Sequence, residues 1–186
     1  MFIEILQQIR WIDIFLILIL GRIIFIGIKK GFITEAFKLL GLLVSIFVTF
    51  HYFGTLAKFV SDRTSFVSDS TAKVFFFLLL LTIVLLVFKL VREGSMVVIK
   101  MEAHPILDKW GGLIVSVVRG LLICSLVLVF FQVWDLEILN KHVKKSLLSS
   151  YVNDLSPGFY ETCFNGFISK FFPNEKLNLS VFKLKN

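Results

Sequence analysis

The chain has 186 residues, of which 57% are hydrophobic, and it carries a formal net charge of +7. Its mean hydropathy of +0.88 excludes an ordinary soluble domain of this length and predicts a membrane protein. The excess of Lys and Arg is typical of loops beside anionic lipid head groups. Nucleic-acid binding is not expected, because the sequence contains no basic–aromatic platform or recognisable nucleic-acid module.

Four apolar runs, separated by short polar stretches, predict an all-α, polytopic membrane protein. The first run is interpreted as a retained helix and not as a signal peptide, because Asp13 and Arg22 lie within it and no small-residue cleavage site follows. Together the runs predict a four-span membrane domain at residues 1–135. The expected transmembrane helices cover residues 12–28, 36–53, 74–91 and 112–134.

The link KKGFITE between the first two spans is very short, so it predicts an antiparallel hairpin. Gly31 is a candidate for the turn residue, because glycine adopts backbone conformations that other residues avoid. Glu35 follows at the start of the second span. Its charge would suit a helix N-terminus and a pair with Lys38, or it would serve as counter-ion for an intramembrane arginine.

The third span is the most purely apolar, so we expect it to be the most exposed to lipid. The polar stretch 54–73 that precedes it predicts a loop or a short surface helix. Four spans place both termini on one side of the membrane. The distribution of Lys and Arg near the spans favours a topology in which the loops 29–35 and 92–111 are cytoplasmic and both termini lie on the opposite side of the membrane.

The fourth span has a small residue at every fourth position and one charge beside that face, Arg119. A face of small side chains lets another helix approach closely in lipid. An arginine at the centre of a membrane helix costs roughly 2.5–3.5 kcal/mol, so it should find a partner. We expect an ion pair with Glu35, which lies towards the same side of the membrane; the alternative is contact with lipid phosphates. The small residues are Gly112, Ser116, Gly120 and Cys124.

After the spans, residues 136–172 predict two amphipathic helices separated at Pro157 and Gly158. Their basic and aromatic residues suit helices on the membrane surface, and equally suit helices that cap the bundle. Residues 173–186 are polar and expected to be loose. Neither a disulfide between Cys124 and Cys163 nor a cysteine metal site is predicted from the spacing.

Three segments of the chain carry a resemblance to a known family: WIDIFLILILG, KKGFITEAFKLLGL and LDKWGGLIVSVVRGLLI. In order and spacing they resemble the colicin V production protein (CvpA) family of bacterial inner-membrane proteins. Thr34, Lys109 and Ser116 depart from the family pattern, although Ser116 preserves the small-residue face. The matching positions are Trp11, Asp13, Gly31, Phe32, Glu35, Leu107, Asp108, Gly112, Arg119 and Gly120.

The resemblance implies a multi-pass protein of the bacterial inner membrane that is required for toxin production or export and has no known catalysis. We therefore expect a non-enzymatic helper in secretion or envelope homeostasis, without a cofactor. Its expected partners are the lipid bilayer, a second copy of the chain or other membrane proteins. The alternative is an oligomeric small-solute transporter or channel component that uses Arg119 and Glu35. The sequence offers no Ser/His/Asp, Cys/His or carboxylate–histidine constellation that would indicate an enzyme.

Overall fold

The computed structural model describes residues 11–63, 68–98, 105–134, 147–171, 175–178 and 180–183. Each of its long helices is apolar enough and long enough to cross a membrane. The predicted all-α, polytopic class is therefore confirmed, and the protein is a multi-pass membrane protein. The four long helices are α2 (Trp11–Lys30), α3 (Phe32–Ser61), α4 (Asp69–Val98) and α5 (Pro105–Val133).

The polar stretch 54–73 differs most from the sequence-based expectation. It continues α3 as far as Ser61 and begins α4 at Asp69, instead of forming a loop or a separate surface helix. Phe53 and Ala57 are buried near the end of α3, so tertiary packing carries this helix beyond its most apolar part. At the start of α4, Asp69 pairs with the lysine one turn later and supports the new helix.

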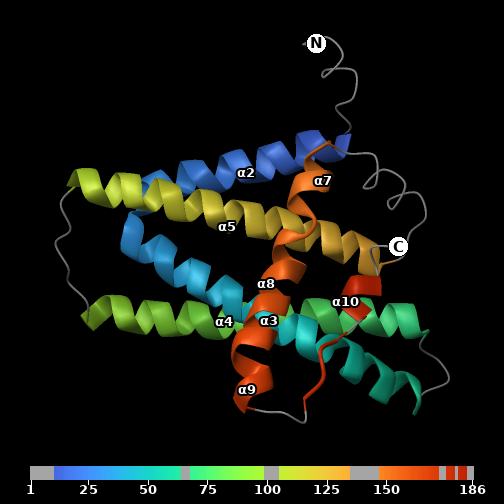
Figure 1. Ribbon diagram of the computed structural model, residues 1–186. Coiled ribbons are helices and arrows are strands. Elements are labelled where there is room, and N and C mark those ends of the chain that lie inside the picture. The colour runs from blue at the N-terminus through green and yellow to red at the C-terminus, as the bar shows by residue number, and fades with distance from the viewer. Residues whose placement is uncertain are drawn as a thin grey trace.

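The long helices lie side by side in the order α2, α5, α3 and α4 (Figure 1). The α3 helix packs along both α4 and α5, and α5 also packs along α2. Although α2 and α3 reverse direction at Gly31, they diverge from this turn and have little contact (Figure 1). The expected reversal between the first two spans is therefore present, but the two helices do not pack along each other, because α5 takes the position beside α2.

The small-residue face of α5 explains why α2 prefers this neighbour. A Cβ atom added at Gly112 would lie only 2.8 Å from the Gly27 carbonyl oxygen and 3.1 Å from the Gly31 carbonyl carbon. Ser116 lies directly against Gly27, and a Cβ atom added at Gly27 would collide with the Ser116 side chain. Two sets of small residues, one from each helix, thus allow the backbones to approach closely.

The same face continues towards the other end of the two helices. A Cβ atom at Gly120 would lie 2.5 Å from Leu20 Cδ1. The Cys124 thiol donates to the Leu16 carbonyl oxygen at 3.7 Å. All four predicted small residues of α5 therefore face α2 of the same chain, so this face is occupied within the protein.

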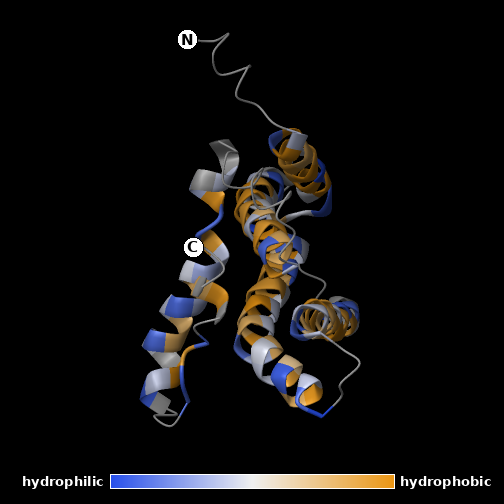
Figure 2. Cartoon of the chain, turned by 90° about the vertical axis from the view of Figure 1, so that its right-hand side faces the viewer, coloured by the Kyte–Doolittle hydropathy of each residue, from blue (hydrophilic) through white to orange (hydrophobic). Residues whose placement is uncertain are grey.

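The α4 helix is the most exposed of the four, as the sequence predicts. Only 6% of the most apolar 18-residue stretch of α4 is buried, compared with 44% of the corresponding stretch of α5. Its inner side is held by α3, where Gly41 makes room for Phe88: a Cβ atom at Gly41 would lie 2.9 Å from Phe88 Cβ. Phe77 is also buried, whereas many other apolar side chains of α4, such as Phe75, Leu86 and Leu90, are exposed. Figure 2 shows that most of the helix is hydrophobic.

Short helices at the C-terminal end run across one face of the bundle, over α2, α5 and α3 in turn (Figure 1). Of the two roles predicted for the segment 136–172, packing on the bundle is therefore observed for α7 and α8; residues 136–146 lie outside the described part of the chain. The elements are α7 (Leu147–Val152), α8 (Leu155–Cys163), the π-helical turn η1 (Phe164–Ile168), α9 (Ser169–Phe171) and α10 (Ser180–Lys183).

Two expectations for this region are corrected by the structure. Pro157 and Gly158 do not separate the tail helices, because they lie inside α8 and the break falls at residues 153–154. Pro157 is tolerated as the third residue of α8, since the N–H groups of the first turn have no intrahelical acceptor. In the segment 173–186, expected to be loose, Val181 is 3% exposed and the Asn178 side chain donates to the Phe50 carbonyl oxygen at 2.7 Å.

The contact between α2 and α5 predicts which glycine the fold requires. Gly112→Ala should destabilise the protein by about 1–3 kcal/mol, because the new methyl group meets backbone atoms that cannot rotate away. Gly21→Ala is the matched control in α2, since a Cβ atom there meets nothing within 4 Å. Thermal unfolding in detergent micelles measures both variants. Equal unfolding temperatures for the two variants would contradict the close contact.

Candidate functional site

The turn between α2 and α3 is held by a side chain from α5. Gly31 has a φ of 78°, a left-handed conformation that strains other residues. The Phe32 N–H, which has no acceptor within its own helix, donates to Asp108 Oδ1 at 2.7 Å. Asp108 therefore caps α3 from a different helix, and a Cβ atom at Gly31 would collide with its carboxylate. The KKGFITE and LDKWGG segments meet at this point.

A buried ion pair lies one helical turn further along α3. Arg119 Nη2 of α5 is 2.6 Å from Glu35 Oε2, and Lys38 Nζ pairs with the other carboxylate oxygen, Oε1. The Glu35 side chain is 0% exposed, while Arg119 is 13% and Lys38 is 15% exposed. The two roles considered for Glu35, a pair with Lys38 and a counter-ion for Arg119, are thus both present.

The energetics of this cluster follow from its apolar surroundings. An unpaired arginine at the centre of a membrane helix costs roughly 2.5–3.5 kcal/mol, and an unpaired buried carboxylate is similarly unfavourable. Placing Glu35 between Arg119 and Lys38 offsets both costs and ties α3 to α5. Each oxygen of Glu35 thus faces a cation, one from each of two helices. The cluster can brace helices and can hold an anion beside its excess positive charge.

The other predicted residues are distributed along the helices. The Phe32 ring lies against Gly111, so it belongs to the same contact between α3 and α5 as Asp108. Trp11 is 49% exposed at the start of α2, a position that suits an interfacial anchor. Asp13, also in the first turn of α2, is 1% exposed. The structure therefore brings Gly31, Phe32, Glu35, Asp108 and Arg119 together, whereas Trp11 and Asp13 lie at the opposite end of α2.

A second polar cluster joins the C-terminal region to α3 and was missed from the sequence. The Tyr160 hydroxyl of α8 lies 3.1 Å from His51 Nδ1, and the Asn178 N–H donates to the same hydroxyl at 3.1 Å. His51 Nε2 is 3.3 Å from Glu175 Oε2. Burial raises the pKa of Tyr160, so its hydroxyl stays protonated and can donate to His51.

This second cluster carried no local sequence signal, because His51 and Tyr160 are 109 positions apart. Only the aromatic spacing of the tail helix could have indicated that Tyr160 faces inwards. His51 lies near the end of the second expected span, and in the structure it is 8% exposed and stacked on Phe47. Its contacts dock the tail onto the bundle.

Metal ligation finds no support in the described ranges. Within them, no group of three or more His, Cys, Asp or Glu side chains is arranged to hold a metal ion. Cys124 is a buried free thiol, and Cys163 is a partly exposed one. The other two histidines, His104 and His142, lie outside the part of the chain that the structure describes.

Comparison with known proteins gives one family match, and it covers the segments that form this site. The family model described as Colicin V production protein matches residues 12–157, which include the α2–α3 turn, the Arg119–Glu35 pair and the start of α8. No curated protein and no solved structure matches the chain.

The ion pair predicts strong energetic coupling between α3 and α5. Glu35→Gln alone and Arg119→Gln alone should each destabilise the fold by about 3–5 kcal/mol, because each removes one member of a buried ion pair and leaves the other poorly compensated. The double variant should lose less than the sum of the two single losses. Chemical unfolding of the four proteins of this cycle in micelles measures the coupling. Strictly additive losses would show that the two side chains do not interact.

Proposed function

Since this chain belongs to the colicin V production protein family, we propose that it is a non-enzymatic helper in the bacterial inner membrane. It would support toxin production or export, or the homeostasis of the cell envelope. Family membership over residues 12–157 and four membrane-crossing helices frame this proposal. The main observation in its support concerns the charged residues that match the family pattern: Glu35, Asp108 and Arg119 all contact other residues of the same chain.

Those charged residues are engaged in contacts within the chain. Asp108 caps α3, and Glu35 is fully buried between two cations. A general acid or base must come within hydrogen-bond reach of a proton on its substrate. A carboxylate enclosed in this way favours a structural role, so we assign these residues to holding α3 and α5 in register.

A helper must also present a surface to its partners. The small-residue face of α5 is covered by α2 of the same chain, so it is not accessible to another protein. The α4 helix, by contrast, has most of its apolar length exposed (Figure 2). This exposed length supports contacts of α4 with lipid, with a second copy of the chain or with other membrane proteins.

The second candidate, an oligomeric transporter or channel component, is favoured by the position of α8. Ser125, near the middle of the apolar segment of α5, donates to the Asn153 carbonyl oxygen at 3.0 Å and accepts from the Ser156 N–H at 2.9 Å. The α8 helix therefore lies beside the middle of a membrane-spanning helix, and it carries two exposed polar side chains there, Glu161 and Thr162. Charged groups at membrane depth usually face protein or a water-filled cavity, which further copies of the chain would enclose.

Reconstitution distinguishes the two candidates. A transporter should give flux of ions or small solutes across vesicles, and this flux should fall when Glu161 is replaced by leucine. A helper should give no flux above that of empty vesicles while it still supports secretion in cells. Crosslinking in the native membrane would then identify the protein with which the helper works.

The proposed structural role of Asp108 gives a direct prediction in cells. Asp108→Asn should retain secretion of colicin V in cells that depend on this chain, because the asparagine side-chain carbonyl can still accept the Phe32 N–H. Asp108→Leu should lower secretion in proportion to the amount of folded protein in the membrane. Toxin activity in the medium, normalised to membrane protein, measures both variants. An Asp108→Asn protein that is abundant and folded but inactive would indicate acid–base chemistry.

A further inference from the structure

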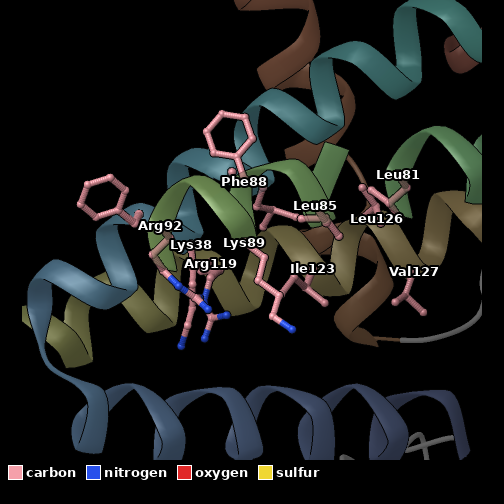
Figure 3. A pocket seen from close by; sticks show the side chains of 13 residues that line it. Lys38, Leu81, Leu85, Phe88, Lys89, Arg92, Arg119, Ile123, Leu126 and Val127 are labelled. Carbon is pink, nitrogen blue, oxygen red and sulfur yellow. The ribbon is translucent and has the colours of Figure 1, made fainter. Parts of the chain in front are cut away.

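A laterally open groove separates α4 from α5. Both helices pack on α3, but they have little direct contact with each other. The space between them forms a cavity of about 460 Å³, lined by residues of α3, α4 and α5 (Figure 3). This volume falls within the range of about 300–1,000 Å³ that is usual for small-molecule sites. The groove is therefore large enough to hold part of an amphiphilic molecule.

One end of the groove is strongly cationic. Lys38 from α3, Lys89 and Arg92 from α4, and Arg119 from α5 all line it. Figure 3 shows the nitrogen atoms of Lys38, Arg92 and Arg119 gathered at this end, with that of Lys89 close by. Three separate helices thus direct positive charge to one place.

These charges exceed the carboxylates beside them. Glu35 neutralises one charge of the four, and it is fully buried behind Arg119 and Lys38. Glu93 is 55% exposed and lies at longer distances, 4.0 Å from Lys89 and 3.8 Å from Arg92. The four cations therefore share two carboxylates, which leaves the cluster with an excess of two positive charges. In addition, Arg119 Nε is buried and has no hydrogen-bond acceptor among the residues that the structure describes.

The rest of the groove is apolar, and it leads away from the cations in one direction. Along α4 the lining continues through Leu85 to Leu81, and along α5 it continues through Ile123 to Val127. Both paths run from the end of the bundle at which α4 ends and α5 begins towards its middle. Figure 3 shows the cationic side chains at one end of the groove and Leu81 and Val127 at the other. A phospholipid in that leaflet has the same order, with its phosphate near the surface and its acyl chains directed inwards.

We propose that this groove binds an acidic phospholipid. The phosphate lies among Lys38, Lys89, Arg92 and Arg119, and one acyl chain lies along the apolar surfaces of α4 and α5. Arginine side chains bind phosphate oxygens through several N–H groups at once, and lysines add point charges. Free phosphate shares the chemistry of the head group, but it makes no use of the apolar part of the groove. A head group with a net negative charge offsets part of the excess positive charge of this cluster.

The test measures lipid binding to the purified full-length chain in a neutral detergent by native mass spectrometry. The probes are phosphatidylglycerol, phosphatidylcholine and inorganic phosphate. Arg92→Gln and Lys89→Gln each remove one groove cation without touching the Glu35 pair. Lys109→Gln is the matched control, because Lys109 is exposed on α5 and does not line the groove. Val127→Trp fills the apolar end.

Phosphatidylglycerol should bind at least about fivefold more tightly than phosphatidylcholine, since one cation near a lipid surface contributes about that factor. Arg92→Gln or Lys89→Gln should weaken phosphatidylglycerol binding about fivefold, Lys109→Gln should leave it unchanged, and Val127→Trp should reduce it with no effect on inorganic phosphate. Unfolding temperatures near that of the parent protein confirm that the variants are folded.

Three results would overturn the proposal. Equal affinity for the two lipids would show that the groove does not recognise negative charge. Equal affinity of Arg92→Gln, Lys89→Gln and Lys109→Gln for phosphatidylglycerol would show that the groove cations are not the binding site. Displacement of phosphatidylglycerol by equimolar inorganic phosphate would identify a site for a free anion instead of a lipid.

Discussion

Arg119 imposes the constraint on which the rest of the bundle depends. A guanidinium inside an apolar helix requires a carboxylate at close range, and Glu35 of α3 provides it at 2.6 Å. This requirement sets the register of α3 against α5. The same register brings Asp108 to the first N–H of α3 and lets Gly31 turn the chain beside it. Residues that are far apart in the sequence thus form one continuous contact.

The small residues of α5 settle which helix lies on its other side. Gly112 and Ser116 allow the backbone of α2 to approach closely, and α2 offers Gly27 at the same level. Since α5 is then held between α2 and α3, the remaining long helix, α4, packs mainly on α3. Its weak contact with α5 leaves the groove, and the cations of three helices meet at the end of that groove.

Much of this arrangement could be predicted from the sequence. Hydropathy located the four spans, and the cost of a buried charge indicated the Arg119–Glu35 contact. The order of the helices could not be predicted. A short link such as KKGFITE indicates that the first two spans are neighbours, whereas the packing of α2 on α5 depends on contacts between residues that are far apart in the sequence. The tail was partly misjudged for a similar reason: Val181 and Asn178 lie in a polar segment, yet they pack on a surface that only the folded bundle presents.

The central claim is that the Arg119–Glu35 pair acts as a brace and not as part of a pathway. Replacing both residues, Glu35→Met together with Arg119→Met, tests this claim most directly, because a buried ion pair can often be exchanged for apolar side chains without loss of stability. The measurement is secretion of colicin V, normalised to folded protein in the membrane. A brace predicts that the double methionine variant retains secretion. A variant that is folded and abundant but does not support secretion would contradict the account.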